Sequence, residues 1–213
     1  MIIAIDGPSA SGKGTIARKL AAHFRLPYLD TGTLYRGVTL ALLRAGHAPE
    51  NKDAAIAIAR GFSKGIGPAL LADPELRSER VSIAAAPVSA IPEVRAHLLD
   101  LQRQFAGQPG GAVLDGRDIA SVIAPQAEVK IYITATPEKR AERRWKELQS
   151  LGQSVTYEAI LKDMLARDAR DATRSVAPAM KTAEAVLIDT TNLSIFETFA
   201  SALQIVKEKT GKS

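Results

Sequence analysis

The chain has 213 residues, of which 46% are hydrophobic and 24% charged, a balance typical of one folded globular domain rather than a disordered or fibrous chain. It contains no cysteine, which excludes disulfides and thiolate chemistry and favours a reducing, cytoplasmic compartment. The net charge of +5 fits nucleic acid or an anionic small molecule, but aromatic residues at 5%, never interleaved with basic ones, argue against stable nucleic-acid binding.

The N-terminal segment predicts a buried strand that runs into a phosphate-binding loop. The apolar run MIIAID precedes GPSASGKGT at residues 7–15. Gly7, Gly12 and Lys13 match the spacing G-x-x-x-x-G-K-[ST], in which backbone N–H groups and a helix N-terminus hold phosphates. Gly14 stands where Ser or Thr is expected and Thr15 follows it, and the variant G-K-G-T resembles the nucleoside monophosphate kinases. The expected ATP-binding residues are Gly7, Pro8, Ser9, Ala10, Ser11, Gly12, Lys13, Gly14 and Thr15.

A second short apolar segment, YL at 28–29, leads into DTGTLYR at 30–36. Ligands bind at the carboxyl ends of parallel strands, so Thr31, Tyr35 and Arg36 are candidates for an anionic substrate. A capped helix start with a surface arginine explains this stretch equally well.

Residues 61–91 interrupt the alternation of strand and helix patterns with three glycines and three prolines. Their apolar content is too high for a free linker. We expect a small insert that packs on the main domain.

The segment AVLDGRD at 112–118 predicts a strand that ends in Asp115. Beside a phosphate loop, a carboxylate in this position typically reaches a magnesium ion. Thr15 and Asp115 are therefore the predicted metal ligands, and Mg²⁺ is the predicted cofactor.

A basic helix is predicted over PEKRAERRWKELQ at 137–149, where Arg140, Arg143 and Arg144 share one face. A solvated charged surface is the common interpretation. In a phosphoryl-transfer enzyme the same face would close over ATP and stabilise charge on the transferred group.

The helical segment ARDARDATR at 166–174 places Arg167, Asp171 and Arg174 on one face. Surface salt bridges explain this pattern. The alternative is a set of groups that bind a nucleotide phosphate and a sugar hydroxyl.

Further apolar segments at 129–135 and 185–189 bring the expected strand count to five. The prediction is an α/β, three-layer P-loop fold with a five-stranded, mostly parallel sheet. Pro92, Pro137 and the pair Ser194 and Glu197 mark expected helix starts.

Together, AIDGPSASGKGT, LDTGTLYR, IPEVR, LDGRDI, KIYITATPEKRAERR, RDARDATR and VLIDTT resemble the bacterial cytidylate kinase family from residue 2 to about 192. The resemblance implies one kinase domain over 1–213, with an insert on the nucleoside monophosphate side at about 61–91 and a helical lid at about 139–156. The insert looks short, and Ala86 falls where the family has a serine near the base, so Ser82 or Ser89 would have to replace it.

The resemblance also implies roles for individual residues. Lys13, Arg117, Arg140, Arg143 and Arg144 would be catalytic. Arg95 and Asp118 would read the cytosine, and Arg167 with Asp171 would hold the sugar. The full set of expected acceptor contacts is Thr31, Tyr35, Arg36, Arg95, Arg117, Asp118, Arg167, Asp171 and Arg174.

The implied activity is transfer of the γ-phosphoryl group of ATP to CMP or dCMP, in a monomer with no membrane contact. Two other functions stay open on the sequence. One is a kinase for another small acceptor such as UMP, AMP or shikimate, and the other is a nucleotide- or RNA-binding module without catalysis.

Overall fold

The computed structural model describes residues 1–62, 67–173 and 177–212 and divides into two compact units. The first comprises 1–29 and 106–213, and the second comprises 30–105. The second unit is longer than the insert predicted at 61–91, and it contains that segment. Arg174 lies outside the described residues.

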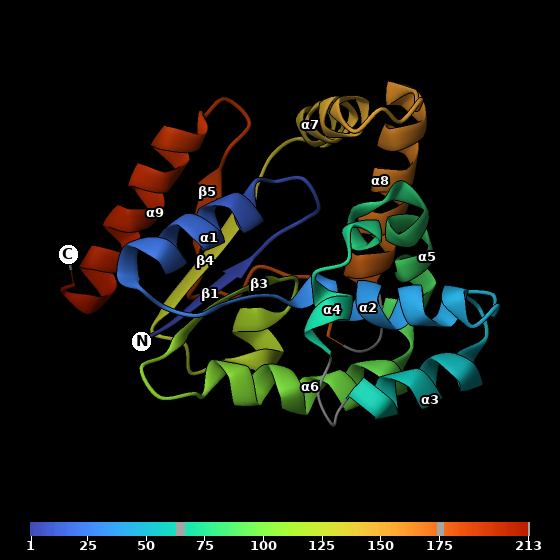
Figure 1. Cartoon of the computed structure of the whole chain (residues 1–213). Coiled ribbons are helices and arrows are strands. Elements are labelled where there is room, and N and C mark those ends of the chain that lie inside the picture. Colours follow the sequence, from blue (N-terminus) through green and yellow to red (C-terminus); the bar gives the residue numbers. More distant parts are fainter. Residues whose placement is uncertain (63–66, 174–176, 213) are drawn as a thin grey trace. The chain divides into compact units, whose positions relative to one another are not determined.

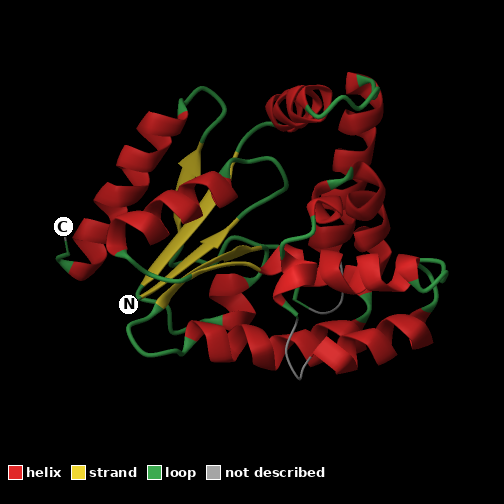
Figure 2. Cartoon of the chain, viewed as in Figure 1, coloured by secondary structure: helices red, strands yellow, loops and turns green. Residues whose placement is uncertain are grey.

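The first unit is built on a parallel five-stranded sheet (Figure 1; Figure 2, yellow). The strand order is β2-β3-β1-β4-β5. All five strands match the apolar segments predicted from the sequence: β1 (Ile2–Asp6), β2 (Tyr28–Asp30), β3 (Ala112–Gly116), β4 (Val129–Thr134) and β5 (Val186–Asp189).

β1 occupies the centre of the sheet. Its residue Ile5 pairs with Asp115 of β3 on one side and with Ile131 of β4 on the other. Because neighbouring strands are parallel, the carboxyl ends of β1, β3 and β4 meet at one edge. The loops that follow these strands therefore lie together, where α/β folds place their ligands.

Helices α1 (Lys13–Phe24) and α9 (Ile195–Thr210) pack on the sheet through one apolar core. Ile16 and Leu20 of α1 and Val206 of α9 are buried against strand residues such as Ile3 and Ile133. α9 begins with the predicted capping box, in which Ser194 and Glu197 satisfy each other's backbone N–H groups.

Three further helical elements complete the first unit. The short π-type turn η2 (Ile119–Ile123) follows β3, α7 (Pro137–Ser150) starts at the predicted proline, and α8 (Tyr157–Thr173) packs on α7. Ala141 and Leu148 of α7 are buried against Ile160 and Met164 of α8. The predicted lid, 139–156, thus covers most of α7 and the loop before α8.

After Asp30, the last residue of β2, the regular elements of the second unit are all helical over its described residues (31–62 and 67–105). The first helix of this unit packs against the elements after residue 70 through a small core of Leu40, Leu76 and Val81. The elements are α2 (Thr31–Arg44), α3 (Lys52–Phe62), α4 (Pro68–Leu71), η1 (Pro74–Arg77), α5 (Glu79–Ala90) and α6 (Pro92–Ala106). None of the helices in the described ranges has both the length and the apolarity needed to cross a bilayer.

Candidate active site

The phosphate loop leaves β1 through a backbone path that needs glycine. Gly7 has φ +151°, and a Cβ there would lie 2.0 Å from the carbonyl oxygen of Ile133. Gly12, with φ +92°, is the N-cap of α1, and Ala10 is also left-handed at φ 55°. These turns bring the loop to the N-terminus of α1, where helix N–H groups favour an anion.

Lys13, the first residue of α1, lies over this loop. Its Nζ donates to the carbonyl oxygen of Pro8 at 3.2 Å. Ser11 is fully buried, and its hydroxyl has no hydrogen-bond partner in the described residues. A buried polar atom of this kind in a loop of backbone donors fits an oxygen-rich ligand such as a phosphate.

Asp115, at the end of β3, lies against the first turn of α1. Its carboxylate accepts a hydrogen bond from the Tyr28 hydroxyl at 2.7 Å, and its Oδ2 would lie 3.5 Å from a Cβ at Gly14. The described residues contain no cluster of three or more acidic, histidine or cysteine ligands. One buried carboxylate near a phosphate loop suits Mg²⁺, which is usually held by one or two protein groups and the phosphates of the substrate.

Arg117 crosses from the loop after β3 to the phosphate loop. Its Nη1 donates to the Gly7 carbonyl oxygen at 2.7 Å, and its Nε donates to Asp171 of α8 at 2.6 Å. Burial alone would lower the pKa of Arg117, but the Asp171 and Asp168 carboxylates outweigh it and raise that pKa. The guanidinium is therefore held charged beside the loop.

Asp6 fixes the other side of the segment that carries Arg117. Its two carboxylate oxygens accept the N–H groups of Ile119 and Ala120, both at 2.8 Å. Burial raises the pKa of Asp6 to about 6, with nearby Asp118 adding to the shift and the two N–H groups opposing it. This carboxylate anchors η2 and with it the loop from Gly116 to Asp118.

The predicted arginines of α7 have separate partners. Arg140 is buried and bonds Asp168 at 2.6 Å, Arg143 bonds the hydroxyl of Thr190 at 2.9 Å, and Arg144 bonds Glu147 at 3.0 Å. Burial lowers the pKa of Arg143. The basic run of α7 therefore divides into two arginines tied to the core of this unit and one near its surface.

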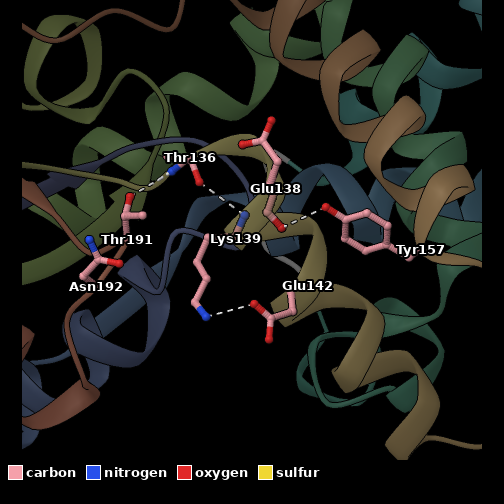
Figure 3. Close-up of a pocket in the computed structure, with 7 residues that line it drawn as sticks. All are labelled: Thr136, Glu138, Lys139, Glu142, Tyr157, Thr191 and Asn192. Atoms are coloured by element: carbon pink, nitrogen blue, oxygen red, sulfur yellow. Dashed lines mark hydrogen bonds and ion pairs between the residues drawn. The ribbon is translucent and has the colours of Figure 1, made fainter.

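An open pocket of about 340 Å³ lies between α7, the start of α8 and the loop after β5 (Figure 3). In this view Thr191 and Asn192 approach from the β5 side, and two of the dashed lines join Thr136 to Thr191 and Lys139 to Glu142. Hydrogen bonds from Lys139 and Lys146 lower the pKa of Glu142 to about 2. The residues that line the pocket are Thr136, Glu138, Lys139, Glu142, Tyr157, Thr191 and Asn192.

Comparison with known proteins agrees with this geometry. Residues 3–208 match the family model described as Cytidylate kinase. The chain is 53% identical over 210 residues to the cytidylate kinase of Methylocella silvestris, covering 97% of this chain and 94% of that protein, and 51% identical to that of Rhodospirillum rubrum over the whole length of both. The chain belongs to the cytidylate kinase family.

A solved structure supports the fold alone. The chain aligns over its full length with 99% of an uncharacterized protein from Eubacterium ventriosum, with a TM-score of 0.54 and 17% identity. The family model and the curated relatives, rather than this structure, confirm the resemblance inferred from the sequence motifs.

The cytidylate kinase motifs that fall in the second unit form a cluster of their own. Arg36 bonds Asp30 at 2.7 Å and Thr33 at 2.8 Å, and the Arg95 guanidinium lies 5.4 Å from the ring centre of Tyr35. Thr31 is buried as the first residue of α2. Tyr35, Arg36 and Arg95 are therefore held by partners within the second unit.

The serines considered as replacements near the base also lie in this unit. The Ser89 hydroxyl donates a hydrogen bond to the carbonyl oxygen of Ala86 at 3.1 Å, and the Ser89 carbonyl oxygen accepts one from Arg95 at 3.4 Å. Ser82 is in the middle of α5. Ser89 thus contacts Arg95 through its backbone carbonyl, while its hydroxyl is bonded to Ala86.

The sequence analysis missed four residues of the first-unit site: Asp6, Tyr28, Asp168 and Thr190. Asp6 and Thr190 stand at or just after the carboxyl ends of β1 and β5, where the rule for parallel sheets could have flagged them. Asp168 is three residues before Asp171 on the same helix face. Tyr28 begins a strand, and nothing in its sequence position indicates that its hydroxyl reaches Asp115.

Proposed function

We propose that this protein transfers the γ-phosphoryl group of ATP to CMP and dCMP, giving ADP and the corresponding diphosphate. The observation that carries this proposal is the convergence, within the first unit, of the phosphate loop, Asp115 and Arg117 in a chain of the cytidylate kinase family. Residues 7–15 bind the ATP phosphates. Residue types and positions here are those that position and stabilise a transferring phosphoryl group.

Lys13 and Arg117 contact the transferred group in this proposal, and the α7 residues Arg140, Arg143 and Arg144 add positive charge around it. Thr15 and Asp115 hold Mg²⁺, which when bound neutralises charge on the phosphate oxygens. An oxygen of the CMP phosphate is already an anionic nucleophile, so no strong general base is needed.

The proposed acceptor contacts are those that the resemblance to the family implies. In the first unit these are Arg117, Asp118, Arg167 and Asp171, and in the second they are Thr31, Tyr35, Arg36 and Arg95. Arg174, which lies outside the described residues, belongs to the same proposed set. We further propose a cytoplasmic monomer that binds no nucleic acid stably.

The direct test is ADP release from ATP and Mg²⁺ with CMP, dCMP, UMP, AMP or shikimate offered separately at equal concentrations. We expect turnover with CMP and dCMP well above that with the other acceptors. Preference for AMP or shikimate would replace the proposal with a different small-molecule kinase. No turnover with any acceptor, together with salt-dependent RNA binding, would favour a binding module.

Base preference is tested with Asp118→Asn. A carboxylate accepts from the exocyclic amine of cytosine but faces a carbonyl in uracil, whereas an amide can donate or accept. We expect the ratio of kcat/KM for CMP over UMP to fall by about ten- to a hundredfold, with KM for ATP unchanged. Asp163→Asn, an exposed position on α8, is the matched control, and an unchanged ratio in Asp118→Asn would remove this residue as the base reader.

A further inference from the structure

Three arginines outside the phosphate loop donate hydrogen bonds to its backbone carbonyl oxygens. Arg117 donates to the carbonyl oxygen of Gly7, Arg140 to that of Ser9 at 3.3 Å, and Arg143 to that of Ser11 at 3.4 Å. The three acceptors alternate along the loop. Each carbonyl is thereby held toward a protein donor, and its orientation also constrains the N–H of the peptide plane to which it belongs.

Thr190 strengthens the last of these contacts. It is 2% exposed, and its hydroxyl lies 2.9 Å from the Ser11 carbonyl oxygen and 3.0 Å from that of Thr134. The backbone N–H of Thr190 already donates to the Thr134 carbonyl oxygen at 2.8 Å. We therefore assign the single hydroxyl proton of Thr190 to the hydrogen bond with the Ser11 carbonyl oxygen. Arg143 binds the same hydroxyl oxygen and the Thr190 carbonyl at 2.6 Å, which fixes the rotamer of Thr190.

Arg140 is anchored just as firmly. Its three guanidinium nitrogens are occupied by Ala135, Ser9 and Asp168, at 3.0, 3.3 and 2.6 Å. A guanidinium that is buried and bonded through all its nitrogens is poorly placed to leave for a ligand, because each lost bond carries a desolvation cost. Besides the charge assigned to it above, Arg140 therefore also acts on a nucleotide through Ser9.

We propose that Thr190, Arg143 and the Arg140–Asp168 pair are positioning residues that set the conformation of the phosphate loop and thereby its affinity for a nucleoside triphosphate. They act by holding the Ser9 and Ser11 carbonyls away from the ligand, so that the loop presents donors to the phosphates before ATP arrives. This inference rests on the proposed kinase function and adds residues outside the loop to its ATP site.

Thr190→Val is the sharpest test because it removes the hydroxyl and keeps the shape. We expect the Kd for ATP, measured by calorimetry without CMP, and the KM for ATP to rise by about tenfold, a change equal to one hydrogen bond of about 1.4 kcal/mol. KM for CMP should stay within about twofold. Thr190→Ser, which restores the hydroxyl, should recover most of the ATP affinity.

The matched control is Thr198→Val. Thr198 is 3% exposed, and its hydroxyl donates to the carbonyl oxygen of Ser194, the N-cap of α9, at 2.8 Å. This change therefore removes a buried threonine hydroxyl away from the loop. We expect a loss of thermal stability similar to that of Thr190→Val and an unchanged Kd for ATP. An equal loss of ATP affinity in both variants would reduce Thr190 to a general structural role and overturn the proposal.

If Thr190→Val does not fold, a second variant tests the same inference. Arg143→Lys keeps a positive charge but loses the guanidinium that spans Ser11 and Thr190, and it should raise the Kd for ATP without raising KM for CMP. Unchanged ATP affinity in a wild-type-like fold would contradict the inference. If wild-type protein binds ATP but phosphorylates neither CMP nor dCMP, the proposed function fails while the loop-positioning inference still stands on the binding measurements.

Discussion

Each of the two units uses an aspartate to hold backbone N–H groups at the start of a short helical element, but in opposite surroundings. Asp6 accepts from Ile119 and Ala120 at the start of η2 and is 2% exposed. Asp73 accepts from Glu75 at the start of η1 and also pairs with Arg44. Burial dominates at Asp6 and raises its pKa to about 6, whereas hydrogen bonds from Glu75 and Arg44 lower the pKa of Asp73.

The two aspartates differ because one lies in the buried region around the phosphate loop and the other in a charged cluster near the surface. Around the phosphate loop, charged groups are buried and bonded to backbone, so they constrain geometry at a cost in solvation. In the cluster of Arg44, Asp73, Glu75 and Arg80, most of the charge is near water, where ion pairs contribute little to stability. Substitutions should therefore have large and specific effects in the first region and small effects in the second.

The largest expected effect comes from Gly7→Ala. The added Cβ would lie 2.0 Å from the Ile133 carbonyl oxygen, so β4 or the loop must shift, and we expect calorimetry to detect no ATP binding. Gly46→Ala is the matched change in the second unit, with φ +77° and no atom within 4 Å of the new Cβ. It carries backbone strain alone, about 1–2 kcal/mol, and should bind ATP normally. Normal ATP binding by Gly7→Ala would contradict the described loop geometry.

The next effect in size is that of Lys13→Ala. If Lys13 acts on the transferred group, as proposed, removing its charge should lower kcat by about 10²–10³-fold. Melting temperature should change little, because the Lys13 side chain is partly exposed and its hydrogen bond to the Pro8 carbonyl oxygen is long, at 3.2 Å. Arg44→Ala removes a cation from the surface cluster and should leave kcat at the wild-type value. A kcat for Lys13→Ala within tenfold of wild type would show that this charge is not used in the transfer step.

The smallest effect is a pair of opposite pH dependences. The raised pKa of Asp6 means that the folded state binds a proton more tightly than the unfolded state, so stability falls as pH rises from about 4 to 6, by about 3 kcal/mol in total. For Asp73 the lowered pKa gives stability that is present above the unfolded pKa and lost as pH falls through the folded value.

Melting curves from pH 3.5 to 7 should therefore show Asp6→Asn gaining stability relative to wild type as pH rises, and Asp73→Asn losing it. Parallel curves for the two variants would mean that burial does not separate the two carboxylates.

The sequence predicted the sheet well because buried parallel strands are short apolar runs, and each of the five runs assigned to a strand became one. Helix starts at Pro92, Pro137 and Ser194 were also confirmed, since capping and proline rules are local. The loop and Asp115 were predicted as neighbours because parallel strands share an edge.

The hydrogen-bond partners of the α7 arginines could not be predicted from the sequence in the same way. Spacing places Arg140 and Arg143 on one face of α7, but it does not indicate that one meets Asp168 and the other Thr190. Those contacts join segments separated by 28 and 47 residues, and they depend on tertiary packing. The serine replacement near the base and the extent of the second unit are likewise set by packing that a linear pattern does not encode.

The position of β1 at the centre of the sheet has a consequence for the synthesis of the chain. Ile2 pairs with Ala112 and Ile3 with Val129, so β1 has no strand partner until translation has passed residue 112. At about 5–20 residues per second this wait is roughly 5–20 s. The continuous segment 30–105 emerges within that interval, while the apolar stretch IIAI has no strand to pair with and is available to chaperones or to another nascent chain.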